Sequence, residues 1–520
     1  MALADEMRSG GGDFARRFLQ TAVVVDDEAY MALTGDDRPE PGLVAPDRRR
    51  RASMRGRQDP VGRGSIHTLN AATVMDAFSA LGVVCGVVGP TDGAKEAMRR
   101  ADIVILDWLL QNDRPEYTLN LIRELLVEEG DRNSLRLVAI YTGEAALEEI
   151  AATLSEELTR AGLDPVLDKD KTTISYRHGR MVLYAKSEVN LAEGLRGRCI
   201  AEEALPGRLV EDFASMTSGL LPGIALTSLT AVREGEHKVL DRFAADLDPA
   251  FLAHRTCLSD PRDAERQIVN HLAEELRGLM DNAVAEASPA GAEAVESWIR
   301  GKGEGAESFV FGDRDLDLER TVALANQGLV ASELGNNAFG DLAAGFSRSD
   351  VVELEERLAW IMSFRTVYNA PAPALWLGTV VTELTGKAGH LICVKPRCDC
   401  VRLEGETSFY FLPLVEPRKE AEQIVVRVDG TFMRLAIDFD QGGWVRREFR
   451  PLDDSDTTIS ARRGSEGGFE FTDVGGNRYI WRGELKAEYA QRIAQAFGAT
   501  LSRVAVDESE WLRRMAKTRR

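Results

Sequence analysis

The chain has 520 residues, of which 44% are hydrophobic and 28% are charged. This length and composition predict three or four globular domains and exclude a disordered or fibrous chain. Lys and Arg number 64 against 84 Asp and Glu, so the net charge is −20. That balance argues against a large binding surface for nucleic acid or for an anionic membrane, because both need positively charged faces.

The cysteines and the apolar segments of the chain indicate in which cellular compartment the protein is expected. Six cysteines without a dense framework are typical of a reducing environment. The start of the chain lacks the apolar segment of a signal peptide, and no apolar run approaches the ~18 residues of a membrane-spanning helix. We therefore expect a cytoplasmic protein with no membrane partner.

The first 200 residues alternate short apolar runs with segments of helical periodicity. The runs predict strands at Thr21–Val25, Val83–Val88, Ile103–Leu106, Leu137–Ile140 and Met181–Tyr184. The spacing of apolar residues between the runs predicts helices over 68–81, 92–100, 117–129 and 145–161. Apolar strands joined by helices indicate an α/β fold, and we expect a doubly wound, parallel, five-stranded sheet.

Residues 35–64 interrupt this pattern with a segment rich in Arg, Pro and Gly. Such a segment buries too little apolar surface to order itself, so we predict a solvated, disordered insertion. Arg48–Arg51 leave a second interpretation open, in which the loop contacts phosphates or another anion.

The pattern changes twice after residue 205. Ile268, Leu272, Leu276 and Met280 recur every four residues and predict a packed helix, and helical signals continue to about residue 365. From residue 366, short apolar runs separated by Gly and Asp turns predict strands, with helices at the end of the chain. We therefore predict a first domain at 1–205, an α-helical region at 206–365 and a β-rich domain at 366–520.

Polar side chains follow four of the predicted strands. Asp26 and Asp27 follow the first strand, Asp107 the third, Thr142 the fourth and Lys186 the fifth. Because parallel α/β sheets bind ligands at the carboxyl ends of their strands, we expect these residues at one edge. Clustered carboxylates need a cation such as Mg²⁺, and Lys and Thr suit phosphate oxygens. The set predicts a site where Asp107 attacks a phosphoryl group and becomes an acyl phosphate.

These residues lie in the segments VVVDDE, DIVILDWLL, VAIYTGE and VLYAKSE, which resemble the receiver domain of two-component response regulators. The resemblance covers roughly residues 18–205. It implies a flavodoxin-like fold and transfer of a phosphoryl group from a histidine kinase to Asp107. Two positions depart from the family: Ser187 stands where the common Pro follows the lysine, and Leu183 replaces the aromatic switch residue, with Tyr184 beside it.

The same resemblance implies a role for each site residue. Asp27 and Asp107 would ligate Mg²⁺ directly, and Asp26 mainly through water. The backbone carbonyl of Leu109 would complete the protein ligands, and Thr142 with Lys186 would hold the phosphoryl group.

Three further segments carry a resemblance that covers the whole chain. LVEDFASMTSGLLPGIALTSLTAVR, ICVKPRCDCVRL and RVAVDESEWLRR resemble receiver proteins of Detocs-type anti-phage defence. There a cytoplasmic histidine kinase phosphorylates a toxic receiver effector, and a second, non-toxic receiver protein competes for the phosphoryl groups. Because this sequence shows no nucleosidase-like motif, the resemblance implies the second, phosphate-buffering partner without an enzymatic output.

Two other functions remain open. His390, Cys393, Cys398 and Cys400 lie close together in the sequence and could bind zinc or serve an unfamiliar effector enzyme gated by the receiver, although buried cysteines are common in strands. A transcriptional regulator would use the Arg48–Arg57 loop, but no helix-turn-helix pattern follows residue 205.

Overall fold

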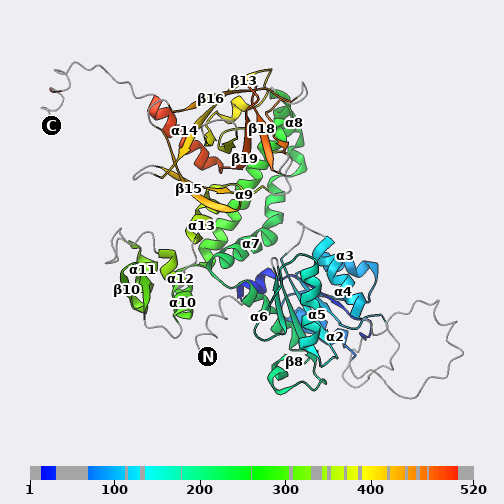
Figure 1. Ribbon diagram of the computed structural model, residues 1–520. Helices are drawn as coiled ribbons and strands as arrows, with labels where there is room; N and C mark the ends of the chain where they lie inside the picture. Colours follow the sequence, from blue (N-terminus) through cyan, green and yellow to red (C-terminus); the bar gives the residue numbers. More distant parts are fainter. Residues whose placement is uncertain are drawn as a thin grey trace. The chain divides into compact units, whose positions relative to one another are not determined.

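The structure is a computed structural model (Figure 1). It describes residues 13–30, 68–111, 115–128, 135–176, 179–258, 260–303, 308–329, 342–347, 353–367, 372–384, 389–417, 422–439, 443–452, 457–464, 468–501 and 514. The predicted insertion at 35–64, with Arg48–Arg51 and the Arg48–Arg57 loop, lies outside the described residues. None of the described helices is both long enough and apolar enough to cross a membrane.

The N-terminal sheet has a parallel centre and an antiparallel edge. Its parallel strands, in spatial order, are β2 (Val84–Val88), β1 (Thr21–Val25), β3 (Ile103–Leu106), β4 (Arg136–Thr142) and β7 (Gly179–Lys186). Beyond β7 the sheet continues with the antiparallel strands β6 (Thr173–Tyr176) and β5 (Val166–Leu167), while β8 (Cys199–Ile200) pairs with the end of β7 in parallel. The sheet is therefore mixed, and the prediction of a purely parallel sheet of five strands was wrong at this edge.

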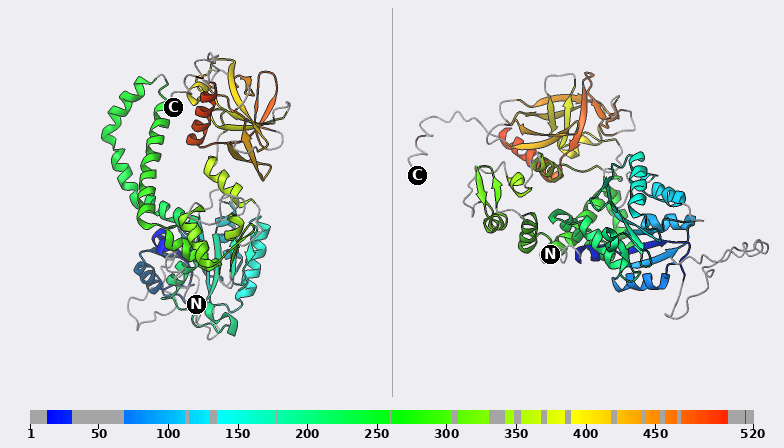
Figure 2. Two further views of the ribbon diagram at one scale, coloured as in Figure 1. Left: turned by 90° about the vertical axis from the view of Figure 1, so that its left-hand side faces the viewer. Right: turned by 60° about the horizontal axis from the view of Figure 1, so that its bottom comes forward.

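Helices cover both faces of this sheet (Figure 2). One face packs against α2 (Ala71–Ala80) and α6 (Leu205–Met216). The other packs against α3 (Asp92–Arg100), α4 (Pro115–Arg123), the π-helical turn Glu124–Glu128 and α5 (Leu147–Arg160). Successive strand residues supply the two cores because their side chains alternate between faces, as Ile105 and Leu106 do.

Further helices follow the sheet. They are α7 (Leu220–Arg242), α8 (Asp248–Cys257), α9 (Asp263–Ala287), α10 (Ala292–Lys302) and α11 (Leu318–Gln327). A hairpin of β9 (Phe309–Phe311) and β10 (Arg314–Leu316) separates the last two. Residues 206–365 were predicted as a helical region, and the hairpin was not predicted. The hairpin strands have three residues each, which is too short to give a detectable alternating pattern.

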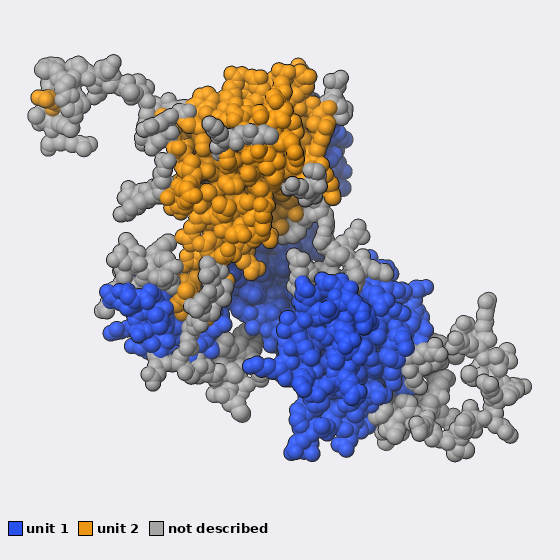
Figure 3. Space-filling view, viewed as in Figure 1, with its two compact units in different colours: residues 1–338 blue, residues 339–520 orange. Residues whose placement is uncertain are grey.

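The chain divides into two compact units, residues 1–338 and 339–520 (Figure 3). Described by itself, the second unit contains a nine-stranded sheet whose neighbours pair antiparallel. Its strands are β11 (Thr379–Glu383), β12 (His390–Cys393), β13 (Thr407–Val415), β14 (Gln423–Val428), β15 (Thr431–Ile437), β16 (Val445–Phe449), β17 (Arg462–Arg463), β18 (Phe469–Thr472) and β19 (Arg478–Glu484). The α-helices described in this unit are α12 (Leu342–Ser347), α13 (Leu354–Ser363) and α14 (Ala487–Leu501). The domain boundaries predicted at 205 and 365 remain a prediction.

Candidate functional site

The strand ends of the N-terminal sheet bring the predicted polar residues to one edge. Val25, the last residue of β1, pairs with Leu106, the last residue of β3, so that Asp26 and Asp107 leave the sheet side by side. Thr142 ends β4 and pairs with Ala185 of β7, so that Lys186 follows directly. Parallel pairing in register therefore places these residues at the carboxyl ends of neighbouring strands.

Lys186 links the two carboxylates at this edge. Its Nζ atom lies 3.1 Å from Asp26 Oδ2 and 3.2 Å from Asp107 Oδ2. The side chain of Lys186 is 3% exposed, and those of Asp26 and Asp107 are 2% and 10% exposed. An ammonium at this depth must be paired, because an isolated charge in the protein interior costs several kcal/mol (order of magnitude).

Burial and charge act in opposite directions on this group of residues. Burial raises the pKa of Asp107 to about 6, although the ammonium of Lys186 opposes the shift. Burial also disfavours the charged form of Lys186, but the carboxylates of Asp26 and Asp107 outweigh it and raise the pKa of the ammonium. The charged lysine beside Asp107 therefore favours the ionised carboxylate, which is the form that a nucleophile requires.

Asp27 is held differently. It is exposed, and its Oδ2 accepts a hydrogen bond of 2.9 Å from the backbone N–H of Gln111. Partial burial of its carboxylate by neighbouring groups nevertheless outweighs that hydrogen bond and raises the pKa of Asp27. Gln111 has a left-handed backbone with φ of 52° and also donates from Nε2 to the carbonyl of Pro90 at 3.2 Å. Through these two hydrogen bonds Gln111, in the loop after β3, links the loops that follow β1 and β2.

The magnesium ligands expected from the sequence are thus only partly assembled. In the part of the chain that the structure describes, no group of three or more His, Cys, Asp or Glu side chains is arranged to hold a metal ion. The donor chemistry nevertheless fits Mg²⁺, because Asp26, Asp27 and Asp107 offer hard carboxylate oxygens at one sheet edge. Leu109, whose carbonyl was the fourth expected ligand, donates its N–H to Asp107 Oδ1 at 3.4 Å.

Thr142 lies buried at the same edge, and a second threonine supports the loop after β3. The Oγ1 of Thr142 accepts the N–H of Glu144 at 3.2 Å. Thr118, on α4, donates its hydroxyl to the backbone carbonyl of Asp107 at 3.0 Å. Thr118 and Gln111 were not predicted, because a threonine in a helix and a glutamine in a loop carry no sequence signal for such contacts.

A comparison with family models identifies this domain. Residues 18–191 match the family described as the response receiver domain. The match spans about a third of the chain and contains all the predicted site residues. Searches of curated proteins and of solved structures found no match. The receiver domain supports a phosphoacceptor role in two-component signalling and implies a phosphodonor such as a histidine kinase.

The residues beside Lys186 show how this receiver domain departs from its family's usual pattern. Leu183 packs in the core on the α5 face, whereas Tyr184 belongs to the opposite core beneath α6. The hydroxyl of Tyr184 donates to Asp212 Oδ2 at 2.5 Å and accepts from Arg208 Nε at 3.0 Å. Tyr184 therefore cannot take the place of Leu183, because neighbouring residues of a strand point to opposite faces.

The histidine and cysteines of the second unit are not brought together as a group that could hold a metal ion. His390 and Cys393 are an odd number of residues apart on β12 and so point to opposite faces of the sheet. The Nδ1 atom of His390 lies 2.9 Å from Thr382 Oγ1. Burial of the imidazole lowers the pKa of His390. Cys393 and Cys400 are buried, which raises the pKa of both thiols, and Cys398 is exposed. The two buried thiols have the surroundings of ordinary core residues, as one of the two interpretations expected.

Proposed function

We propose that this protein accepts a phosphoryl group on Asp107 from a histidine kinase in a Mg²⁺-dependent reaction. The observation that carries the proposal is the pair of contacts that Lys186 Nζ makes, at 3.1 and 3.2 Å, with Asp26 and Asp107. A buried lysine beside an ionised carboxylate supplies both a nucleophile and a positive charge for phosphoryl oxygens. The receiver family of residues 18–191 supports the same reaction class.

The transfer uses the chain's own residues in distinct roles. A carboxylate oxygen of Asp107 attacks the phosphorus of a phosphohistidine, the new P–O bond forms as the P–N bond breaks, and the released imidazole nitrogen takes up a proton. Lys186 exchanges its contact with Asp107 for the phosphoryl oxygens, and Thr142 offers them a hydroxyl donor. Mg²⁺, held by Asp27, Asp107 and the carbonyl of Leu109, with Asp26 acting through water, would neutralise the charge of the transferred group.

We further propose that the chain serves as a regulator or phosphate sink in anti-phage defence. In this role it competes with a receiver effector for one cytoplasmic histidine kinase and has no catalytic output of its own. The whole-chain resemblance described above supports this part of the proposal.

The first experiment uses acetyl phosphate, a small phosphodonor that replaces the kinase. The full chain is incubated with acetyl phosphate and Mg²⁺ and run on a phosphate-affinity gel. We expect a shifted band for the wild type and for Asp92→Asn, an exposed carboxylate at the start of α3, but none for Asp107→Asn. Hydroxylamine should remove the shift, because it cleaves acyl phosphates. A shift that persists in Asp107→Asn would contradict the proposal.

A second experiment separates a sink from a switch. The kinase is loaded with radioactive phosphate and presented with the competing receiver effector, with or without this protein. A sink lowers the label on the effector in proportion to its own concentration, and Asp107→Asn abolishes that effect. Unchanged labelling of the effector, with this protein itself labelled, would refute the sink role and leave the phosphoacceptor role standing.

A further inference from the structure

The three carboxylates at the edge of the receiver sheet accept backbone N–H groups that lie at different distances along the chain. Asp26 and Asp107 each accept the N–H of the residue two positions later, at 2.8 and 3.4 Å. Asp27 accepts the N–H of Gln111, which lies 84 residues further along the chain, at 2.9 Å. Lys186 contacts the first two carboxylates. The orientation of Asp27 therefore depends on a residue of another loop, the one that follows β3.

The backbone conformation of Gln111 brings its N–H to Asp27. The φ angle of 52° lies in the left-handed region, which residues other than glycine adopt rarely. Gln111 is exposed, so packing does not hold this conformation. Its side chain anchors the residue instead, because Nε2 donates to the carbonyl of Pro90, in the loop after β2, at 3.2 Å. An uncommon backbone conformation that hydrogen bonds maintain beside a reaction site points to a role at that site.

A hydrogen bond of this kind suits a residue that binds a metal ion. Carboxylate ligands of metals are themselves oriented by hydrogen bonds, and loss of such a partner lowers metal affinity by about 10–100-fold. An ionised carboxylate has about four acceptor positions, so the N–H of Gln111 can orient Asp27 and leave lone pairs for a cation. Because Asp27 is exposed, a side chain without this hydrogen bond would lose more rotational freedom on binding an ion.

We propose that Gln111 is a positioning residue for the Mg²⁺ site. Its N–H orients Asp27 for the ion, and its side-chain amide fixes the loop after β3 to the loop after β2. This inference rests on the proposed function, in which Asp27 holds Mg²⁺. It adds that metal affinity depends on one left-handed residue outside the set of ligands. Phosphoryl transfer itself, once the ion is bound, does not require Gln111.

The test measures binding of Mn²⁺ to the full chain by electron paramagnetic resonance, because Mn²⁺ accepts the same oxygen ligands as Mg²⁺. Gln111→Val places a β-branched residue at a left-handed position, so that the N–H turns away from Asp27. Gln111→Gly keeps both the N–H and the left-handed backbone. We expect Gln111→Val to bind Mn²⁺ about tenfold more weakly than the wild type and Gln111→Gly to stay within about threefold of it.

Ser288→Val is the matched control for backbone strain. Ser288 is exposed and left-handed, with φ of 45°, and it follows α9, outside the residues that match the receiver family. Both valine variants should lose stability, but Ser288→Val should bind Mn²⁺ as the wild type does. Asp27→Asn should weaken Mn²⁺ binding, which assigns the measured ion to this site. Binding that is unchanged in Asp27→Asn would overturn the inference.

Phosphorylation by acetyl phosphate separates this role from the proposed function. A high Mg²⁺ concentration should restore the rate of Gln111→Val to within about twofold of the wild type, because only metal affinity is changed. If Gln111→Val binds Mn²⁺ as tightly as the wild type and both are phosphorylated, Gln111 has no positioning role and Asp107 remains the phosphoacceptor. A wild type that shows the expected Mn²⁺ affinities but is not phosphorylated would uphold the role of Gln111 and refute the proposed function.

Discussion

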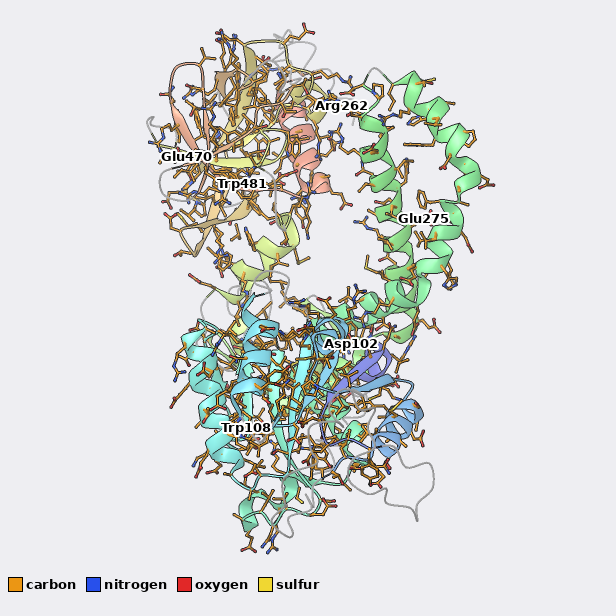
Figure 4. All side chains as sticks on the ribbon, turned by 90° about the vertical axis from the view of Figure 1, so that its right-hand side faces the viewer. Asp102, Trp108, Arg262, Glu275, Glu470 and Trp481 are labelled. Carbon is orange, nitrogen blue, oxygen red and sulfur yellow. The ribbon has the colours of Figure 1, made fainter. Side chains whose placement is uncertain are left out.

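Arg233 on α7 forms an ion pair with Asp102, which immediately precedes β3; the distance from Nη2 to Oδ1 is 3.0 Å. Asp107 follows the same strand at its other end, and Figure 4 labels Asp102 and Trp108, the residue after Asp107, at these two ends. The guanidinium of Arg233 also lies 4.3 Å from the ring centroid of Phe18. One short strand thus connects the edge of the sheet that carries Asp107 to α7.

We predict that Arg233→Met loosens this attachment. In the variant the buried carboxylate of Asp102 loses its ion pair with Arg233 but keeps the hydrogen bonds from the backbone N–H groups of Gln20 and Thr21. These hydrogen bonds compensate only partly for the lost ion pair. Because the side chain of Arg233 is 37% exposed, the expected loss is about 1 kcal/mol after solvent screening. Hydrogen–deuterium exchange of peptides covering β1, β3 and α7 should become faster. Arg242→Met, which removes the more exposed pair with Glu275, is the control and should leave the β1 and β3 peptides unchanged.

Lys186→Met should destabilise the receiver domain strongly. Without the ammonium, Asp26 and Asp107 face each other in a buried site with no compensating charge, and breaking a buried pair costs about 3 kcal/mol or more. The urea dependence of native-state hydrogen exchange in β3 and β7 measures this loss. Lys95→Met, which removes a partly exposed pair with Glu124, should be close to neutral.

A double-mutant cycle assigns that loss to the pair rather than to packing. Adding Asp26→Asn to Lys186→Met removes one of the two carboxylates left without a partner. The double variant should therefore be less destabilised than the sum of the two single variants. Strict additivity would show that Lys186 stabilises the domain by packing alone.

Tyr184→Phe separates stability from phosphorylation. The variant loses hydrogen bonds to Asp212 and Arg208, and because Asp212 is buried we expect a loss of about 1–2 kcal/mol in the free energy of unfolding. The rate and lifetime of phosphorylation by acetyl phosphate should stay unchanged, since Tyr184 lies on the face opposite Leu183. A changed lifetime would mean that Tyr184 acts as a switch after all. Tyr141→Phe, which removes one neutral bond to the carbonyl of Ile200, is the matched control for stability.

The sequence was informative where apolar runs end in polar residues. Asp26, Asp107, Thr142 and Lys186 could be placed at one edge because parallel strands end there together. The β5–β6 hairpin could not be predicted, since Val166 and Leu167 are exposed and the turn after them is polar. A strand of two residues carries no periodicity.

Contacts that depend on backbone conformation could not be predicted from the sequence either. The left-handed conformation of Gln111, which aims its N–H at Asp27, is uncommon for glutamine and leaves no trace in the sequence. The sequence predicted all three carboxylates as magnesium ligands, whereas the structure joins Asp26 and Asp107 to Lys186 and bonds Asp27 to the N–H of Gln111 instead. His390 and Cys393 are close in the sequence, which suggested that both could bind one metal ion. They lie on the same strand, and an odd spacing on a strand places the two side chains on opposite faces of the sheet.

The last prediction concerns Glu202, which follows β8 and accepts the N–H of Asn70 at 3.0 Å. Burial raises the pKa of this carboxyl from 4.5 to about 7. The folded state therefore binds a proton that the unfolded state releases between these values. The contribution of this group to stability is fully present below pH 4.5 and is lost as the pH rises through 7.

Glu202→Gln imitates the protonated form and can still accept the N–H of Asn70. We expect the variant to be more stable than the wild type at pH 8, by about 1 kcal/mol after solvent screening of this half-buried group, and equally stable at pH 4.5. Urea unfolding followed by circular dichroism at the two pH values measures the difference. Glu203→Gln, the neighbouring exposed carboxylate, should change neither value. A Glu202→Gln variant that is less stable at pH 8 would show that Glu202 is needed there as a carboxylate.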